Sequence, residues 1–529
     1  MAETMKINDP DNTTSNPRVA GGAKTMNEII EVRVSRREFL GGAAAVSTSL
    51  ALGGCATAGR GASSDPIDFS FSEIARGIDG THHVAPGYTA DVVIRWGDPL
   101  FDDSPSFDPM GQTEAAQLRQ FGYNNDYLGF LPLPSDSSGR AHGLLCVNHE
   151  YVTTQLMLPD IVANYPQSMT AELCLAEMAA HGGSVVEVVE TGDGWTPVIG
   201  SRYNRRITAH RTPMDITGPA AGSTRLATSA DPSGRRVVGT MNNCAGGITP
   251  WGTWLMAEEN FNYHFLGELP DGHAETRNHQ RYGVPSTLYQ WGRHIDRYDL
   301  SHEPNEPNRF GWIVEVDPME PTSTPKKRTA LGRFKHEGAE SVVAPSGQLV
   351  IYMGDDQRFD YVYKFVSEDR VDVSDPSANV DLLDSGTLYV ARFDADGSLD
   401  WLPLVHGAGP LTADNGFSSQ ADVLIETRRA GDLLGATPMD RPEDVEPDPR
   451  TGSVWVMLTN NHRRTPDQAD AANPRGPNLF GHIIQIVEPD GDFTSTTSRW
   501  EVMVKCGDPN DPSVDAAWNP RITEHGWFG

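Results

Sequence analysis

Short apolar runs separated by turn residues recur along most of this chain. Runs rich in β-branched and aromatic residues occupy 184–190 (SVVEVVE), 361–367 (YVYKFVS) and 481–487 (GHIIQIV), each followed closely by Gly, Pro or Asp. Such runs predict β-strands. Pro-Ser-Gly at 345–347 and Asp-Pro-Arg-Thr-Gly at 448–452 each lie between two of these runs, and both predict a hairpin.

Helices should be few, because 52 glycines and 38 prolines interrupt the chain. The best helical pattern covers 168–180. Repeated strand, turn, strand units from about residue 70 onward predict an all-β fold, a β-propeller, although a pair of large β-sandwiches would give a similar pattern. Segments 271–290 and 465–477 are expected to be irregular loop insertions at one mouth of the propeller. No interdomain linker is evident, so residues 56–529 are expected to form a single domain.

The N-terminal 55 residues have the features of an export signal. Ser35-Arg36-Arg37-Glu38-Phe39-Leu40 precedes a short, weakly apolar stretch of small residues at 41–54. A basic pair followed by such a stretch is typical of a twin-arginine signal peptide. The stretch is too short for a membrane-spanning helix, which needs about 20 residues. The alternative is a buried Ala/Gly helix that happens to follow two arginines.

A lipid anchor is a second expectation for the same region. Leu52-Gly53-Gly54-Cys55 resembles a bacterial lipobox, in which the cysteine becomes the lipidated first residue of the mature chain. Alternatively, Cys55 is removed with the signal. We therefore expect residues 1–55 to be a leader recognised by the twin-arginine export machinery. The remaining protein is expected to be periplasmic or secreted, or anchored to a membrane as a lipoprotein.

The charge and cysteine content exclude several classes of protein. A formal net charge of −30 repels nucleic acid, so no nucleic-acid partner is expected. Hydrophobic content of 38% and a mean hydropathy of −0.43 exclude a multi-span membrane protein. The five cysteines show no CxxC and no paired spacing, which argues against a disulfide framework or a zinc ribbon. We expect a monomer, and its acidic charge suits a soluble extracytoplasmic protein or one whose carboxylates are partly neutralised by bound cations.

Acid-rich motifs follow several of the predicted strands. They contain Glu150, the pair Glu258-Glu259, Glu337, the pair Asp355-Asp356 and Glu443, with Cys244 in the same set. A propeller brings strand ends together around its centre, and converging carboxylates need cations. Oxygen ligands select hard ions such as Ca²⁺, Mg²⁺, Mn²⁺ or Fe³⁺, and a thiolate shifts one position toward a transition metal. Alternatively, the Asp pair forms a turn, the Glu pair is solvated and Cys244 is a small buried hydrophobe.

Longer motifs in this order resemble the PhoX-type alkaline phosphatases. They are NNCAGGITPWGTWLMAEEN, GRFKHEGAE, VIYMGDDQRFDYVYKFV, GTLYVARFDADG, MDRPEDVEPDPRTGSVWVMLTNN and ANPRGPNLFGHII. The resemblance implies a β-propeller of about six blades with a mixed centre of Fe³⁺ and Ca²⁺. It also implies hydrolysis of phosphate monoesters outside the cytoplasm, with small phosphorylated substrates.

The same resemblance assigns roles to individual residues. Cys244 matches an iron-ligating thiolate, and Arg441 matches the arginine that contacts the substrate phosphate as a forked donor. The metals would clamp the phosphoryl oxygens and provide the attacking oxygen. A related phosphodiesterase or phytase-like hydrolase and a non-catalytic, calcium-stabilised propeller are the alternatives. The expected metal ligands are Cys244, Glu150, Glu337, Glu443, Glu259 and Asp356, and the expected substrate-binding residues are Arg441, Arg475 and Asn478.

Overall fold

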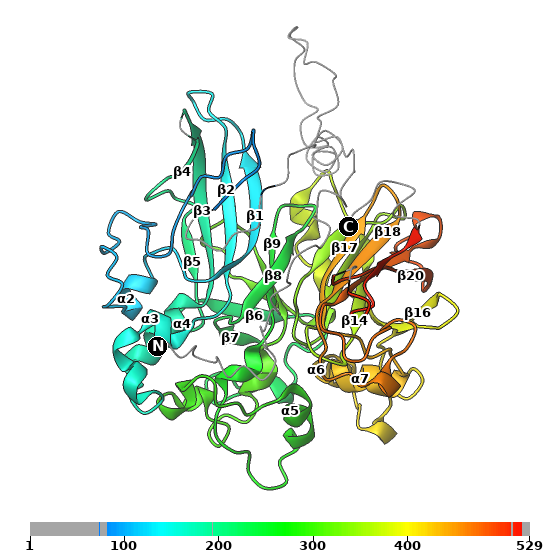
Figure 1. Cartoon of the computed structure of the whole chain (residues 1–529). Coiled ribbons are helices and arrows are strands. Elements are labelled where there is room, and N and C mark those ends of the chain that lie inside the picture. Colours follow the sequence, from blue (N-terminus) through cyan, green and yellow to red (C-terminus); the bar gives the residue numbers. More distant parts are fainter. Residues whose placement is uncertain (1–73, 75–81, 193, 509–510, 521–529) are drawn as a thin grey trace.

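A computed structural model describes the chain except for residues 1–73, 75–81, 193, 509–510 and 521–529 (Figure 1). The predicted export signal and Cys55 lie outside the described residues. The described part is mostly β-structure arranged in three sheets. None of its helices combines the length and the apolar character that crossing a membrane would require.

The first sheet has five strands in the order β1-β2-β3-β4, with β5 also pairing with β3. The second has six strands in the order β7-β6-β11-β10-β9-β8, and its β6–β11 pair is parallel. The strands of the first sheet are β1 (Asn125–Leu133), β2 (His142–His149), β3 (Gly182–Thr191), β4 (Gly194–Pro197) and β5 (Arg205–Ile207). Those of the second are β6 (Pro213–Thr217), β7 (Arg236–Val238), β8 (Asn243–Ile248), β9 (Trp254–Glu258), β10 (Ile313–Val316) and β11 (Lys326–Arg328).

The third sheet contains two antiparallel meanders, β12 to β16 and β17 to β20, joined where β16 pairs with β20. Its end strands approach each other, because β17 also packs against β12 and β13, so the sheet is nearly closed. The two predicted hairpins are confirmed as β12–β13 and β17–β18. The strands are β12 (Glu340–Val343), β13 (Gln348–Gly354), β14 (Val362–Arg370), β15 (Gly386–Phe393), β16 (Ser398–Pro403), β17 (Pro442–Asp448), β18 (Ser453–Leu458), β19 (His482–Val487), β20 (Thr497–Lys505) and β21 (Ala517–Trp518).

The helices are short and lie around the sheets. Helix α4 confirms the predicted helical segment; it begins after Thr170, whose hydroxyl accepts a hydrogen bond from the Leu173 amide at 3.3 Å. The segment 271–290, expected to be an irregular insertion, carries one helical stretch, α5. The α-helices are α2 (Glu114–Gln117), α3 (Thr154–Met157), α4 (Ala171–Ala180), α5 (Thr276–Tyr282), α6 (Gln420–Ile425) and α7 (Thr427–Leu434), and 3-10 turns such as η5 (Phe261–His264) join the strands.

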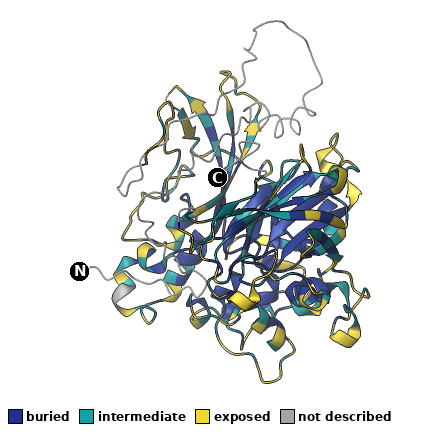
Figure 2. Cartoon of the chain, turned by 45° about the vertical axis from the view of Figure 1, so that its right-hand side comes forward, coloured by how far each residue is buried: buried dark blue, intermediate teal, exposed yellow. Residues whose placement is uncertain are grey.

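Two large clusters of buried side chains form the core. One includes Trp254, Trp291 and Trp312 and draws on all three sheets, and the other includes Tyr352 and Trp401 within the third sheet. Figure 2 shows buried strands in the interior and exposed residues mainly on turns and outer helices. The mostly β architecture with few helices confirms the predicted fold class, a propeller-like all-β fold. The count of six blades and the single domain over 56–529 stay predictions.

Candidate active site

Strand ends from all three sheets converge on a cluster of acidic side chains. Potential ligand atoms of Asp126, Glu150 and Cys244 lie within 4.8 Å of one another, and so do those of a second group, Glu259, Glu337 and Asp356. Cys244 joins the groups, because its Sγ lies 3.0 Å from Oε1 of Glu337 and 3.4 Å from Oδ2 of Asp126. We call these six residues the acidic centre.

Two glycines allow the strands to approach closely enough to build the acidic centre. A Cβ at Gly247 in β8 would lie 2.2 Å from the carbonyl oxygen of Ala339, so only glycine lets the Cys244 strand pack against the segment that carries Glu337. A Cβ at Gly354 would lie 2.1 Å from the carbonyl oxygen of Glu443. This second approach places the end of β13, and Asp356 beyond it, beside the start of β17.

Asparagine side chains hold the first sheet against the second at this point. Asn148, at the end of β2, donates from Nδ2 to the carbonyl oxygens of Cys244 at 2.5 Å and Ala245 at 3.1 Å. The amide of Glu150 donates to the carbonyl oxygen of Asn124 at 3.1 Å. These bonds fix Glu150 and Cys244 relative to each other although they are far apart in sequence.

Burial and mutual repulsion disfavour the ionised forms in the acidic centre. Burial first, and then the nearby carboxylate of Asp356, raise the pKa values of Glu259 and Glu337 well above their ordinary values. Burial and the charge of Asp126 raise the pKa of Glu150 in the same way, and burial with Glu150 raises that of the Cys244 thiol. Without added positive charge, the site therefore favours protonated ligands.

Arg441 lies at the edge of the acidic centre with its guanidinium held in a fixed orientation. Its Nε and Nη2 donate to the two carboxylate oxygens of Asp356 at 2.8 and 2.6 Å, and Nη2 lies 3.8 Å from Oε1 of Glu443. The backbone of Arg441 is left-handed, with φ of 50°, which is uncommon for a residue other than glycine. Burial and the nearby charge of Asp356 raise the pKa of Glu443 to about 7. Thus Glu443 adjoins the acidic centre through Arg441.

In each of the two acidic pairs, Glu258-Glu259 and Asp355-Asp356, the first residue forms a structural ion pair and the second belongs to the acidic centre. Glu258 is fully buried, and its Oε1 accepts from Nζ of Lys327 at 2.6 Å. Asp355 is also fully buried and pairs with Arg428, whose Nε donates to Oδ2 at 2.8 Å. Their neighbours Glu259 and Asp356 are the ones that belong to the acidic centre. The alternative of a solvated Glu258-Glu259 pair is therefore wrong, because both side chains are buried.

The structure uses Arg475 and Asn478 in a separate network. Nη1 of Arg475 donates to the carbonyl oxygens of Cys506 at 2.7 Å and Val514 at 3.2 Å. Asn478 is fully buried and donates from Nδ2 to Oδ2 of Asp440 at 3.1 Å. These bonds connect the loop before β19 to its surroundings, and substrate contact by either residue stays a prediction.

Sequence reasoning missed Asp126 as a member of the acidic centre. The residue lies inside β1, where the pairing of Asn125 with His149 brings it beside Glu150. The only local signal is Asn124-Asn125-Asp126 at the start of a strand, a pattern that also marks ordinary turns. Its pKa is raised, chiefly by burial.

The chemistry of the acidic centre fits bound cations. Five carboxylates and one thiol point at one another, and Oε1 of Glu259, buried, has no hydrogen-bond partner among the described residues. The buried side-chain oxygens of Asn242, two residues before Cys244, and of Asn260, directly after Glu259, also have no hydrogen-bond partner among the described residues. Oxygen donors with one sulfur donor suit hard cations, with one position favouring a transition metal.

Comparison with known proteins identifies the family. Residues 69–528 match the family model of alkaline phosphatase PhoX. The fold is similar to that of Pseudomonas fluorescens PhoX in complex with vanadate, a transition state analogue, with 43% identity and a TM-score of 0.76. That match covers 81% of this chain and 74% of the other. No curated protein matched the chain. The chain therefore belongs to the PhoX family of metal-dependent alkaline phosphatases, which hydrolyse phosphate monoesters.

Proposed function

We propose that the acidic centre holds a mixed centre of ferric iron and calcium, at which this chain hydrolyses phosphate monoesters. Cys244 is assigned to iron, because a thiolate is the one soft donor in the set. Glu150, Glu259, Glu337 and Asp356 are assigned to the cations as oxygen ligands, with Asp126 added from the geometry, and Glu443 adjoins them. The observation that carries the proposal is the contact of the buried Cys244 thiol with two half-buried carboxylates, 3.0 Å from Glu337 and 3.4 Å from Asp126.

Arg441 is the residue we assign to the substrate phosphate. Its planar guanidinium matches the non-bridging oxygens of a phosphate, and Asp356 holds the fork in a fixed orientation. Binding the phosphate there brings it against Glu443 and the ligands of the acidic centre. When bound, the cations supply Lewis-acid activation of the phosphoryl group and of water. The vanadate complex of the relative supports the same reaction class for this chain.

Metal analysis of two cysteine variants tests the proposal. We expect Cys244→Ser to lose iron while calcium stays bound, because serine lacks the soft thiolate donor. Cys174→Ser is the matched control, since Cys174 is also buried but lies in α4 and is not part of the acidic centre. Elemental analysis of protein prepared from a periplasmic extract gives the readout. Equal iron content in the two variants would remove Cys244 from the iron site.

Calcium removal is a second test of the proposed metal centre. A calcium chelator should abolish phosphatase activity and lower the melting temperature together, because the cations hold the converging carboxylates. Added Ca²⁺ should restore both while iron remains bound. Full activity in metal-free protein would contradict the proposed centre.

We also infer export through the twin-arginine machinery, with a periplasmic or secreted location. Replacing Arg36-Arg37 with Lys-Lys should leave precursor in the cytoplasm, as measured by cell fractionation. Cys55→Ser should release the protein from membranes if the lipobox is processed. Continued export of the double-lysine variant would argue against the twin-arginine signal.

A further inference from the structure

Asp440, the residue before Arg441, carries a buried carboxylate that accepts from three side chains. Its Oδ1 accepts from Nδ2 of Asn461 at 2.8 Å and from Nε of Arg464 at 2.5 Å, and its Oδ2 accepts from Nδ2 of Asn478 at 3.1 Å. All four side chains are at most 3% exposed. We call Asp440 and its three donors the Asp440 clamp. A buried carboxylate with a guanidinium and two amides as partners is held in one orientation.

The backbone around Arg441 is bonded on two sides. The amide of Thr459, directly after β18, donates to the carbonyl oxygen of Arg441 at 3.2 Å. On the other side, Asp440 forms an isolated β-bridge with Arg358, two residues beyond Asp356. The Asp440 clamp therefore lies between the loop after β18 and the turn that carries Asp356, the partner of the Arg441 guanidinium.

The conformation of Arg441 requires support of this kind. Its φ of 50° is left-handed, and a residue other than glycine keeps such a conformation only where the surrounding structure imposes it. The Asp440 clamp acts on the residue directly before Arg441, so it sets the backbone from which the Arg441 side chain starts. With a donor of the clamp removed, this backbone can relax toward an ordinary conformation and displace the guanidinium.

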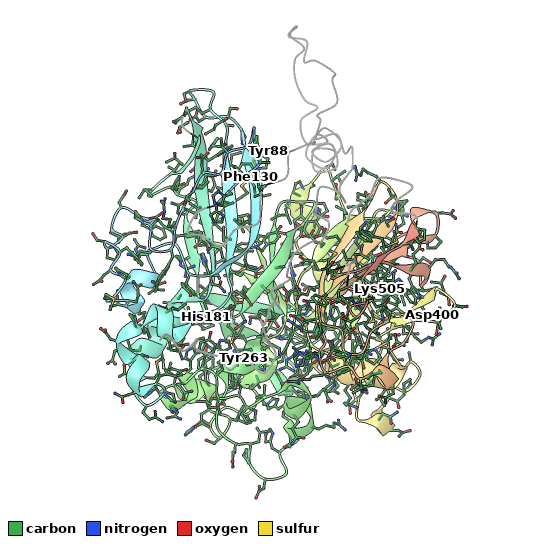
Figure 3. The ribbon with its side chains drawn as sticks, in the orientation of Figure 1. Tyr88, Phe130, His181, Tyr263, Asp400 and Lys505 are labelled. Carbon is green, nitrogen blue, oxygen red and sulfur yellow. The ribbon has the colours of Figure 1, made fainter. Side chains whose placement is uncertain are left out.

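The side-chain amide of Asn478 uses both its nitrogen and its oxygen within the fold. Besides Asp440, its Nδ2 donates to Nδ1 of His482 at 3.1 Å, and its Oδ1 accepts from the amide of Gly481 at 3.0 Å. The other ring nitrogen of His482 lies 2.8 Å from a backbone carbonyl oxygen and carries the proton, so Nδ1 is the acceptor. His482 begins β19 and pairs with Lys505 of β20, which Figure 3 labels in the half of the molecule that the third sheet forms. Asn478 thus anchors the Asp440 clamp to the third sheet.

We infer that the Asp440 clamp positions the arginine assigned to the phosphate: it holds the left-handed backbone of Arg441 so that the guanidinium meets the substrate. The inference rests on the proposed function, because Arg441 is assigned to the phosphate there. It makes Asn478 a positioning residue that acts through Arg441, in place of a direct contact with the substrate.

A double-mutant cycle between Asn478 and Arg441 tests the inference. In the metal-loaded enzyme, Asn478→Ala should lower kcat/KM for a phosphate monoester by about tenfold, less than the roughly 10²-fold that a 1 Å misplacement can cost, because two donors of the clamp remain. In the Arg441→Ala background the same substitution should change kcat/KM by about twofold or less, because no guanidinium is left to position. Iron and calcium contents should match the parent. A tenfold loss in both backgrounds would overturn the inference, since Asn478 would then act on the substrate or the metals without Arg441.

Two further variants separate positioning from a loss of stability. Asn461→Ala removes another donor of the Asp440 clamp and should show the same loss of kcat/KM and the same dependence on Arg441. Asn308→Ala is the matched control, because Asn308, in the 3-10 turn η8 (Glu306–Arg309), is also fully buried. Its side chain donates to a backbone carbonyl oxygen at 3.1 Å and accepts from Asn278 at 2.9 Å. The control should lower the melting temperature but keep the parent kcat/KM; an equal loss of kcat/KM there would make stability the cause and the inference wrong.

The single variants distinguish failure of this inference from failure of the proposed function. If Arg441→Ala hydrolyses the monoester like the parent, the assignment of Arg441 to the phosphate fails and this inference fails with it. If Arg441→Ala is impaired but Asn478→Ala and Asn461→Ala are not, this inference alone is wrong. Inhibition by inorganic phosphate gives a readout besides turnover: the inhibition constant should rise in both clamp variants and stay at the parent value in Asn308→Ala, and an unchanged constant in the clamp variants would contradict the positioning role.

Discussion

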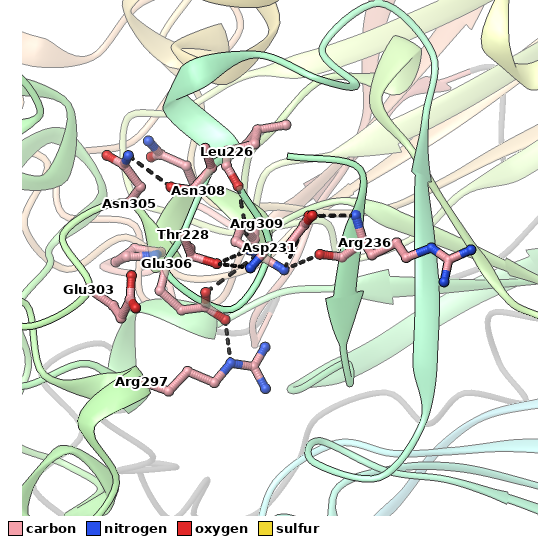
Figure 4. Close-up of polar contacts among 12 residues, drawn as sticks. Leu226, Thr228, Asp231, Arg236, Arg297, Glu303, Asn305, Glu306, Asn308 and Arg309 are labelled. Carbon is pink, nitrogen blue, oxygen red and sulfur yellow. Dashed lines mark hydrogen bonds and ion pairs between the residues drawn. The ribbon is translucent and has the colours of Figure 1, made fainter. Parts of the chain in front are cut away.

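The acidic centre and the ion-pair network around Arg309 treat buried charge in opposite ways. In the network, the guanidinium of Arg309 lies 3.4 Å from Glu306 and 3.9 Å from Asp231, and Arg297 pairs with the same Glu306 (Figure 4). Each carboxylate there faces a guanidinium. In the acidic centre, five carboxylates and a thiol face one another. The carboxylates of the network are neutralised by arginines of the same chain, whereas those of the acidic centre need bound cations.

Two further glutamates, one paired with an arginine and one adjoining the acidic centre, show the same difference in their pKa values. Burial alone would raise the pKa of Glu275, but hydrogen bonds and charge from Arg225 lower it to about 2. Burial and the nearby Asp356 instead raise the pKa of Glu443 to about 7, although Arg441 opposes the shift. Buried carboxylates are common in this fold, so burial does not identify the functional ones. The convergence of several carboxylates without matching cations does.

Breaking a neutralised pair should have the largest effect on stability. Lys364 is fully buried, and its Nζ lies 3.2 Å from Oε1 of Glu488. Lys364→Met leaves that carboxylate without its cation and should lower the free energy of unfolding by about 3–5 kcal/mol. Chemical denaturation of the calcium-loaded protein measures this. Lys364→Met combined with Glu488→Gln should recover part of the loss, and kcat/KM of the folded variants should match the parent.

Removing the guanidinium of Arg441, at the edge of the acidic centre, should affect catalysis instead. Arg441→Ala should lower kcat/KM for a phosphate monoester by about 10²–10³-fold, equivalent to about 2.7–4 kcal/mol, while metal content stays normal. Arg441→Lys should recover only part, because an ammonium group lacks the planar fork. Arg309→Met is the comparison from the network, and it should lose stability but keep kcat/KM. If Arg441→Ala turns over substrate like the parent, the assignment of Arg441 is wrong.

Local features of the fold could be predicted from the sequence, and long-range pairings could not. The hairpins β12–β13 and β17–β18 and helix α4 follow from turn residues and periodicity over a few residues. The parallel β6–β11 pair and the β16–β20 pair join segments about 100 residues apart, and no local pattern specifies them. Segment 271–290, expected to be an irregular loop insertion, contains the helix α5 over Thr276–Tyr282.

The candidate site shows the same limit. The motifs identify the Glu258-Glu259 and Asp355-Asp356 pairs, but which member belongs to the acidic centre depends on three-dimensional pairing. Lys327 neutralises Glu258 across the sheet, and Arg428 neutralises Asp355 from α7, so the second member remains for the centre in each case. Asp126 escapes prediction because only the pairing of β1 with β2 places it beside Glu150.

Widening the contact between β8 and the Glu337 segment should weaken the acidic centre without changing any ligand. Gly247→Ala places a Cβ 2.2 Å from the Ala339 carbonyl oxygen, so the strands must separate. We expect a loss of stability of about 1–3 kcal/mol together with lower iron content and activity. Gly192→Ala is the control, because no described atom lies within 4 Å of its added Cβ. Normal iron content in Gly247→Ala would show that this approach does not position Cys244.

A pH-dependent effect, small for each pH unit, should come from an acid that is neutralised by protonation in the folded protein. Glu177 is buried in α4, accepting hydrogen bonds from Thr154 at 2.5 Å and from Nε1 of Trp291 at 2.9 Å, and burial raises its pKa to about 7. Between the ordinary pKa of 4.5 and about 7, the folded state binds a proton that the unfolded state releases. This group's stabilising contribution is therefore complete below pH 4.5 and is lost as the pH rises through 7, by at most about 1.4 kcal/mol for each pH unit.

Glu177→Gln removes this titration while keeping the size of the side chain and an acceptor for Trp291. The variant should gain stability relative to the parent as the pH rises from 5 to 8, measured as the difference in free energy of unfolding between the two calcium-loaded proteins. Taking the difference cancels the titration of the acidic centre, which both proteins share. A pH-independent difference would mean that Glu177 is ionised in the folded protein. Its burial would then be offset by the Thr154 and Trp291 hydrogen bonds alone, and the fold would hold buried acids by pairing them or by donating to them, without using protons.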